Sequence, residues 1–509
     1  MNPYIGIING KPGWVQLLKQ EGLFYKVFKP GDNPAVLIVD ELSEKSEILE
    51  YLSEGGFILT DTATLGTLLN ERTKRVRIDY IIPDTSPFFK NSGIVDIYNR
   101  GYVLNRKGYG RINNRFPALF EFSYKKGWGI ALPFDVSSVI LDSSRRTKFF
   151  YTKKGRFPVE YVSSVSRGEV RKLVVNALRY LFRKRRLYYI HKWYYPEGKK
   201  NGFFFRIDTD KSDFKEILDT YRIAEKNGLS LTFFIDVKSL NEDINKLKEL
   251  EKQEIAVHSF EHRIFKDSIK NRENFSKAKE LLLKKGIETK GIAVPYGFWS
   301  SPLGFTIEEL GFLYSSEFSF SYDDLPSYSY IETRFLNVLQ IPIHPISPGT
   351  LLYVKNNVDD IKSYFERIIQ EKYARDEPLS LYGHSGIFSN HPSILEHIIN
   401  AVKSKKGIWF GTYGDFYEWW RERENSNPEI LFDGSILKMK GIEENSRLTL
   451  RIITPEGKRT IVPLKKEVNL KELNFTEVPK TRAFDKNKLQ VKQRALKLKL
   501  KEMENWIRR

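Results

Sequence analysis

The chain has 509 residues, 41% of them hydrophobic and 29% charged, so it is long enough for about two or three domains with buried cores. It contains no cysteine, which excludes disulfides, cysteine nucleophiles and thiolate metal ligands and leaves His, Asp and Glu to bind any metal. The formal net charge of +19 predicts an anionic partner.

The sequence predicts a cytoplasmic protein. It shows no apolar run of about 18 residues that could cross a membrane. The first residues, MNPYIGIINGKPGW, lack the basic segment followed by an apolar segment that is typical of a signal peptide. If the anionic partner is a membrane, we expect peripheral attachment at its inner face.

Residues 1–195 begin with alternating strand and helix patterns. Apolar runs at Tyr4–Ile8 and Ala35–Val39 are separated by helical spacing at Trp14–Leu18. The alternation predicts a Rossmann-like α/β domain with a mostly parallel sheet. It resembles the flavodoxin-like or class I amidotransferase-like fold. The amidotransferase nucleophile is a cysteine, which this chain lacks, so the resemblance implies a scaffolding or binding role.

A basic and aromatic segment closes this region. A helix predicted over 167–187 runs into Arg183–Arg186, which is followed by Tyr188, Tyr189 and the run Trp193–Tyr195. One interpretation is a linker helix whose aromatic rings pack on the next domain. The other is an interfacial anchor, with basic residues on lipid head groups and rings at the polar boundary.

Residues 200–425 carry a longer alternation of strand and helix patterns, beginning with a predicted strand at Phe203–Ile207. Repeated βα units over about 220 residues predict a distorted (β/α) barrel. The short strand patterns that follow predict a small β module at 426–485. The lysine-rich stretch 486–509 is predicted to be a basic helical tail.

Two motifs follow predicted strands of the barrel. His258 and His262 are four residues apart, and with 7 His in 509 residues such a pair is expected about 0.1 times by chance. On a helical turn both imidazoles would reach one cation. Asp208 and Asp210 follow the strand Phe203–Ile207 and offer either a metal ligand and a base or a helix N-cap.

Taken in order, four motifs resemble those of the polysaccharide deacetylase family, also called the NodB-homology or family 4 carbohydrate esterase fold. The resemblance covers residues 200–425. The motifs are Asp208-Thr209-Asp210, His258-Ser259-Phe260-Glu261-His262, Val294-Pro295-Tyr296-Gly297 and Leu381-Tyr382-Gly383-His384.

The resemblance implies a catalytic role or a ligand role for each motif. It implies that one of Asp208 and Asp210 is the catalytic base and the other a metal ligand, and we assign Asp208 as the base. It also implies His384 as general acid and the backbone N–H of Tyr296 as oxyanion donor. It implies Asp210, His258 and His262 as ligands of a divalent metal, zinc first and cobalt or nickel as alternatives. Pro295, Trp299 and His344 are candidate substrate contacts.

Two departures from the family pattern bear on activity. Thr209 separates carboxylates that are usually adjacent, and Ala293 stands where the third motif usually has the arginine that holds the base. Another arginine could replace it, the base could be tuned differently, or activity could be lost. A catalytically inactive glycan-binding protein is therefore the alternative function.

The resemblance implies hydrolysis of an N-acetyl group on a sugar. Because we expect a cytoplasmic protein, the substrate would be a glycan or a lipid-linked glycan precursor in cell-surface polysaccharide biosynthesis, met at an anionic membrane surface. The net charge of +19 also fits nucleic acid, but no nucleic-acid-binding motif is present, so we rank that partner last.

Overall fold

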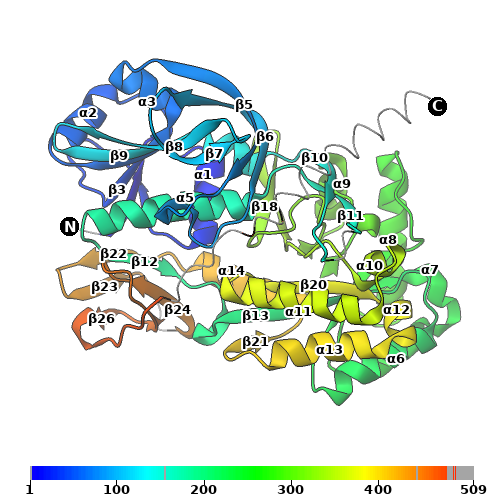
Figure 1. Ribbon diagram of the computed structural model, residues 1–509. Helices are drawn as coiled ribbons and strands as arrows, with labels where there is room; N and C mark the ends of the chain where they lie inside the picture. The colour runs from blue at the N-terminus through cyan, green and yellow to red at the C-terminus, as the bar shows by residue number, and fades with distance from the viewer. Residues whose placement is uncertain (1–2, 154–155, 443–444, 479–484, 486–487, 489–509) are drawn as a thin grey trace, which may run out of the picture. The chain divides into compact units, whose positions relative to one another are not determined.

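The computed structural model describes residues 3–153, 156–442, 445–478, 485 and 488 (Figure 1). The chain divides into two compact units. Unit 1 comprises Met1–Asp142, Ser164–Gly198 and Trp420–Phe484, and unit 2 comprises Ser143–Ser163, Lys199–Trp419 and Asp485–Arg509. Within the described part of the chain, no helix combines the length and apolar character needed to cross a bilayer.

These units differ from the predicted domains in two places. The segment 143–163, predicted as part of the N-terminal domain, belongs to unit 2, and the predicted C-terminal β module belongs to unit 1. The C-terminal difference arises because residues 450–453 pair with residues 189–192. The segment 143–163 contacts unit 2 through side chains, such as Arg145 at Trp299 and Phe298. The predicted helical tail at 486–509 lies outside the described residues, apart from Lys488.

Unit 1 is built on a nine-stranded sheet in the order β2-β1-β3-β4-β9-β8-β7-β5-β6. The first five strands of that order pair in parallel. They are β1 (Ile5–Ile7), β2 (Tyr25–Val27), β3 (Val36–Val39), β4 (Phe57–Asp61) and β9 (Gly127–Leu132), with helices α1 (Pro12–Glu21), α2 (Lys45–Ser53), α3 (Thr62–Leu69) and α4 (Val136–Leu141). The predicted parallel α/β arrangement is correct for this half.

The other half of the sheet is antiparallel, which the sequence pattern did not reveal. It consists of β5 (Thr73–Ile82), β6 (Val95–Leu104), β7 (Tyr109–Ile112) and β8 (Phe116–Tyr124), with the short helix η1 (Pro87–Phe89) between β5 and β6. The sheet is therefore mixed rather than mostly parallel.

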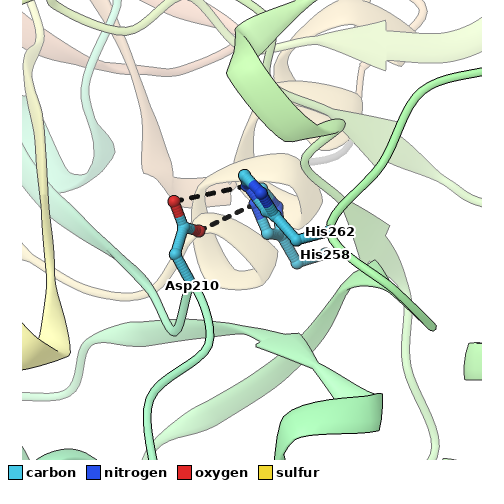
Figure 2. A group of neighbouring side chains, drawn as sticks. All are labelled: Asp210, His258 and His262. Atoms are coloured by element: carbon cyan, nitrogen blue, oxygen red, sulfur yellow. Dashed lines mark ion pairs between the residues drawn. The ribbon is translucent and has the colours of Figure 1, made fainter.

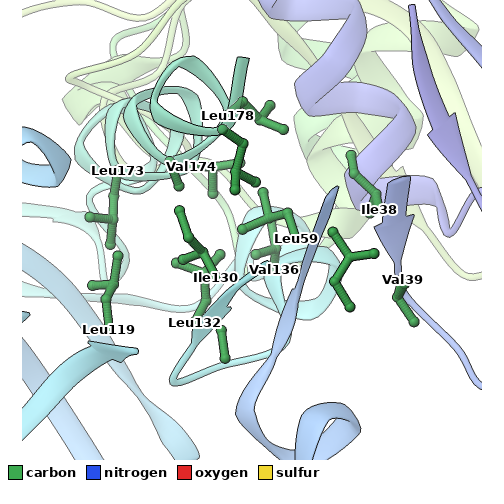
Figure 3. Packing of buried hydrophobic residues seen from close by; sticks show 14 of the residues in the cluster. Ile38, Val39, Leu59, Leu119, Ile130, Leu132, Val136, Leu173, Val174 and Leu178 are labelled. Carbon is green, nitrogen blue, oxygen red and sulfur yellow. The ribbon is translucent and has the colours of Figure 1, made fainter. Parts of the chain in front are cut away.

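Helix α5 (Arg167–Lys184) covers the sheet of unit 1, at a position where the sequence predicts a helix. Its apolar residues recur at helical spacing, so one face is buried. Figure 3 shows Leu173, Val174 and Leu178 of this face against Leu59 and Ile130 of the sheet. This contact between helix and sheet is part of the hydrophobic core of unit 1.

Two three-stranded sheets complete unit 1. One joins β12 (Tyr189–Lys192) to β24 (Asn445–Ile453) and β25 (Arg459–Leu464), and the other joins β22 (Glu429–Phe432), β23 (Ile436–Lys440) and β26 (Glu467–Asn469). The short helices η2 (Pro196–Gly198) and η5 (Leu470–Glu472) follow β12 and β26. The predicted β module thus depends on a strand from residues 189–192.

Four of the five aromatic rings of the basic segment are buried, so these four rings cannot anchor the segment at a membrane interface as the first interpretation expected. Trp193 is 2% exposed, and Tyr189, Tyr194 and Tyr195 are equally enclosed. The hydroxyls of Tyr194 and Tyr189 donate hydrogen bonds to the buried carboxylate of Glu21, at 2.5 and 3.2 Å. The rings pack inside unit 1, whereas the alternative interpretation expected them to pack on the next domain.

Unit 2 contains a curved, mostly parallel sheet in the order β18-β19-β17-β16-β15-β14-β13-β20, and β21 also pairs with β13. The strands are β13 (Asn201–Asp208), β14 (Thr232–Asp236), β15 (Glu254–Ser259), β16 (Gly291–Ile292), β17 (Tyr314–Ser315), β18 (Ser327–Ile331), β19 (Arg334–Gln340), β20 (Leu379–His384) and β21 (Ile408–Phe410). Only β18 is antiparallel to its neighbour among these described strands. This arrangement confirms the predicted distorted (β/α) barrel as an open sheet.

Helices follow the strands of unit 2 as βα units require. They are α6 (Phe214–Lys226), α7 (Val237–Leu240), η3 (Asn241–Glu249), α8 (Ser268–Lys284), η4 (Pro295–Gly297), α9 (Ser301–Glu309), α10 (Pro348–Tyr353), α11 (Val358–Ala374), α12 (Ser385–Asn390), α13 (Pro392–Lys403) and α14 (Tyr413–Asn425). The hairpin of β10 (Arg145–Phe149) and β11 (Val159–Ser163) joins this unit, with the Arg145 guanidinium 4.6 Å from the ring of Phe298.

Candidate metal centre

The three predicted ligands meet at the carboxyl ends of the barrel strands (Figure 2). Asp210 Oδ1 lies 3.1 Å from His258 Nε2, and Asp210 Oδ2 lies 3.3 Å from His262 Nε2. One ligand atom from each residue falls within 4.8 Å of the other two. Ligand atoms on a tetrahedral zinc ion, each about 2.0–2.1 Å from the metal, are about 3.3 Å apart. The spacing therefore fits a shared cation.

The hydrogen bonding of these side chains also fits a cation. His258 Nδ1 donates to the carbonyl of Ala293 at 2.5 Å, which leaves Nε2 as the atom that faces Asp210. His258 Nε2 and Asp210 Oδ1 are buried and make no hydrogen bond that satisfies normal geometry among the described residues. Buried polar atoms are rarely left without a partner, and a cation between these two would satisfy both.

The two histidines do not share a helical turn, which corrects the expected local structure. His258 is the penultimate residue of β15, and His262 lies on the loop that follows. The side chain of Asn274 in α8 holds this loop by donating to the carbonyls of Glu261 and Arg263, at 3.1 and 3.0 Å. The loop brings the imidazole centroids to 4.9 Å, so the predicted pair is formed by a different backbone path.

The electrostatics of this group favour an ionised Asp210. Burial by itself would raise the pKa of Asp210, but its close pairing with the neighbouring imidazoles holds it well below its usual value. The pKa of His258 is raised, because pairing with Asp210 outweighs the effect of its burial. The raised pKa of His258 means that a cation would compete with its proton, so we expect metal binding to release protons.

Asp208 is held apart from the three ligands by a buried ion pair with Arg206. Arg206 Nε and NH2 donate to the two carboxylate oxygens at 2.5 and 2.7 Å, and NH1 donates to the Ser316 carbonyl at 2.5 Å. Both side chains project to the same face because they are two residues apart on β13. An arginine from this strand thus holds the carboxylate of Asp208, although Ala293 carries no such group.

His384 lies beside Asp208 through the pairing of β13 with β20, which places the two residues directly opposite each other. Its Nε2 is 3.5 Å from Asp210 Oδ2. Atoms of Asp208, Asp210 and His384 also lie within 4.8 Å of one another. The residues predicted as base and acid therefore border the carboxylate predicted as a ligand, and their roles remain predictions.

The loop of the third motif brings Tyr296 to the same place. Tyr296 is 64% exposed, has a φ of 63°, and places its ring 4.8 Å from that of His262. A non-glycine residue in this left-handed region is uncommon and costs about 1 kcal/mol or more, so the surroundings must impose it. Glu317 contributes by accepting the Val294 N–H at 3.1 Å, just before the buried Pro295.

Two of the candidate substrate contacts lie in the packed interior instead. Trp299 is 1% exposed, and its ring packs 4.8 Å from that of Phe320. His344 is buried with Nε2 3.0 Å from the Tyr364 hydroxyl, and burial holds its pKa well below the usual value. A buried indole cannot stack on a sugar, so Trp299 has a packing role, whereas the role of His344 stays a prediction. Pro295 is also buried, which leaves Tyr296 as the accessible ring of that loop.

Sequence reasoning missed a further carboxylate, Asp236 at the end of β14. Its backbone N–H donates to Thr209 Oγ1 at 2.9 Å, and its Oδ2 accepts from the Lys211 N–H at 3.3 Å. These bonds hold the residues on both sides of Asp210. Its Oδ1 is buried and makes no hydrogen bond in the described part of the chain. The signal in the sequence was an acidic residue ending the apolar run Thr232–Asp236.

Comparison with known proteins gives similarities in solved structures alone. No protein-family model and no curated protein matches the chain. A structure assigned as a polysaccharide deacetylase from Mycobacterium smegmatis is similar over 47% of this chain and 97% of that one, with 15% identity and a TM-score of 0.40. A structure assigned likewise from Pseudomonas aeruginosa PAO1 is similar over 45% of this chain and 94% of that one, with 16% identity and a TM-score of 0.39. A family 4 carbohydrate esterase pseudoenzyme from Bacillus anthracis is similar over 44% of this chain and 68% of that one, with 14% identity and a TM-score of 0.30.

Proposed function

We propose that unit 2 is a metal-dependent hydrolase that removes an acetyl group from the nitrogen of an N-acetylated sugar. The observation that carries this proposal is the convergence of Asp210, His258 and His262, with ligand atoms 3.1 and 3.3 Å apart, beside a separately held Asp208. Three protein ligands of this type leave a coordination position open, as in catalytic rather than structural zinc sites. The ordered motifs of the sequence supply the reaction class.

The side chains divide the work of amide hydrolysis. A bound divalent metal would supply a Lewis acid that polarises the acetyl carbonyl and makes water more acidic. Asp208, oriented by Arg206, accepts a proton from the attacking water. As the C–O bond forms and the C–N bond breaks, His384 donates a proton to the leaving nitrogen, because an unprotonated amine leaves poorly. The products are acetate and a free amine.

The Tyr296 loop supports two further parts of the proposal. The main-chain N–H of Tyr296 is the donor proposed for the oxyanion that develops on the acetyl oxygen. Its exposed ring, beside His262, offers a face on which a sugar can pack. Zinc is the metal that best matches a site with two imidazoles and one carboxylate, with cobalt and nickel as alternatives.

The finer proposal concerns the substrate and its location. The net charge of +19 supports an anionic membrane surface, and therefore a lipid-linked glycan in cell-surface polysaccharide biosynthesis. Each Lys or Arg near such a surface contributes about 1 kcal/mol, so several suffice for peripheral attachment. The buried rings of unit 1 add nothing to this attachment, which would depend on charge alone.

The test combines metal analysis with acetate release from N-acetylglucosamine oligomers. We expect near-stoichiometric zinc, cobalt or nickel in the purified chain and acetate release that stops in Asp208→Asn with the metal retained. Metal and activity should both be lost in the double variant His258→Ala, His262→Ala. Metal and glycan binding without acetate release would favour the alternative, an inactive glycan-binding protein. No metal in either form would refute the metal centre.

A further inference from the structure

The β10–β11 hairpin of unit 2 presents one face to solvent and packs the other face on the barrel. Its register places Thr147 opposite Tyr161 and Lys148 opposite Glu160, so these two pairs project to opposite faces. Tyr161 is 45% exposed. Lys148 is buried, and its ammonium group donates to the Tyr322 hydroxyl at 3.1 Å. The face that carries Tyr161 is therefore the one that a ligand can reach.

The hairpin contacts two borders of the proposed hydrolytic site. On one border, β10 contacts the loop of the third motif through Arg145. On the other, the carboxylate of Glu160 in β11 accepts a hydrogen bond from Thr350 Oγ1 of α10 at 3.2 Å. The first turn of α10 lies beside the proposed acid, because a Cβ atom on Gly349 would be 3.7 Å from His384 Nδ1. Both contacts place the hairpin at the same end of the barrel as the site.

The guanidinium of Arg145 is oriented by the loop of the third motif. Its NH1 donates to the carbonyl of Trp299. The guanidinium also lies over the rings of Phe298 and Tyr161, at 4.6 and 5.8 Å from the ring centroids. Contact with an aromatic ring uses the flat face of a guanidinium and leaves its edge, which carries five N–H donors, for hydrogen bonds. Most of these donors are therefore available to a ligand.

No acidic side chain balances this charge. In the described part of the chain Arg145 makes no ion pair, and the Trp299 carbonyl is its one hydrogen-bond acceptor. Its side chain is only partly buried, so a ligand can approach it. The guanidinium of Arg206, in contrast, is buried and paired with Asp208. An oriented, accessible guanidinium without a counter-charge is suited to binding an anionic group.

Arg145 also lies close to the exposed ring that is proposed to contact the sugar. Tyr296 and Phe298 are two residues apart, so their Cα atoms are at most about 7.6 Å apart. The Tyr296 ring lies 4.8 Å from the ring of His262, a proposed metal ligand. Tyr161 and Tyr296 thus supply two exposed rings near one oriented cation. Rings of this kind can pack on the apolar faces of successive sugars while the cation binds a charged substituent.

We propose that Arg145 and Tyr161, oriented by Phe298, form a subsite for an anionic sugar residue that adjoins the N-acetylated residue of the glycan. This inference rests on the proposed deacetylase function and names its substrate class, a glycan that carries carboxylate or phosphate groups. Both groups match the edge of a guanidinium in geometry as well as in charge. A glycan of N-acetylglucosamine alone would leave Arg145 without a counter-charge.

The first experiment measures binding to the full-length protein by calorimetry at constant ionic strength. It compares a hyaluronan hexasaccharide, in which N-acetylglucosamine alternates with glucuronic acid, with the neutral hexamer of N-acetylglucosamine. We expect the charged hexamer to bind about tenfold more tightly, the effect of one hydrogen-bonded charge. Arg145→Gln should remove this preference and leave the affinity for the neutral hexamer nearly unchanged, because glutamine keeps a donor for the Trp299 carbonyl.

Two further variants control for net charge and for stacking. Lys284→Gln removes one exposed charge at the end of α8 and should keep the preference for the charged hexamer. Tyr161→Ala should weaken the binding of both hexamers, because it removes an exposed ring and no charge. A preference that Arg145→Gln leaves unchanged would belong to another cation, the metal centre included, and would overturn the proposal.

The second experiment separates the two anionic groups. N-acetylglucosamine 1-phosphate is compared with N-acetylglucosamine in the same titration. A gain in affinity that depends on Arg145 for the phosphate alone identifies phosphate as the group, and a gain for hyaluronan alone identifies the carboxylate. Equal affinity for charged and neutral ligands in both comparisons would overturn the subsite. These titrations need no turnover, so a failure to release acetate would count against the hydrolase and not against the binding of an anionic sugar.

Discussion

The buried pair of Arg206 and Asp208 gives the sharpest prediction, because breaking it should affect stability and catalysis in distinguishable ways. Arg206→Met removes two charge-assisted hydrogen bonds to Asp208 and one to the Ser316 carbonyl. Removing one partner of a buried ion pair typically costs about 3–5 kcal/mol, since the remaining charge is left uncompensated. For a unit of this size we expect the melting temperature to fall on the order of 10 °C.

A double-mutant cycle measures the pairing itself. Asp208→Asn combined with Arg206→Met should cost less than the sum of the two single changes, because the double variant buries no unpaired charge. We expect a coupling energy of about 2–3 kcal/mol from the thermal unfolding of the four proteins. Single effects that simply add would refute the pairing of Arg206 with Asp208.

The catalytic part of this prediction uses the conservative variant. Arg206→Lys keeps the positive charge but cannot form the two-pronged contact, so the carboxyl group of Asp208 should keep a cationic partner but lose its orientation. We expect acetate release to fall about 10²-fold with metal content unchanged, since small misplacements of a catalytic group have effects of that size. A rate equal to that of wild type would show that the orientation of Asp208 does not matter.

Three further predictions concern the metal centre and the neighbouring hairpin. The double variant His258→Ala, His262→Ala should lose its bound metal in elemental analysis, and equal metal in both proteins would contradict the site. Asp236→Asn should weaken metal binding about tenfold in chelator competition, because it loosens the loop around Asp210, and unchanged affinity would limit Asp236 to packing. Burial raises the pKa of Glu160 to about 7. The folded protein therefore binds this proton more tightly than the unfolded chain, and stability should fall by about 3 kcal/mol as pH rises from about 4.5 to 7. Glu160→Gln should remove that part of the pH dependence of the melting temperature, and an unchanged profile would contradict it.

Much of the candidate centre could be predicted from the sequence because it depends on strand ends. Asp210 and His258 each follow or end an apolar run, and parallel strands bring their carboxyl ends to one edge. The spacing of His258 and His262 identified both imidazoles, although the expected helical turn is a loop. Arg206 was missed because its relation to Asp208 depends on knowing that both lie on one buried strand.

The roles of several aromatic residues could not be predicted in the same way. Trp193 and Trp299 stand in polar or loop-like sequence, where local pattern does not distinguish a packed ring from an exposed one. Both are buried because segments from elsewhere cover them, as the ring of Phe320 does for Trp299. Tyr296, in the same loop as Trp299, remains exposed.

The sequence by itself therefore determined the α/β character of both units, the barrel-like region and the identity of the clustered histidines and carboxylates, because these follow from local periodicity and short motifs. Only the tertiary structure decided that β12 completes a sheet with β24 and that Arg206 takes the carboxylate of Asp208. The physical reason is that strand pairing joins β12 to a segment far away in the sequence, and that burial makes Arg206 and Asp208 an ion pair on one strand; no local pattern records either.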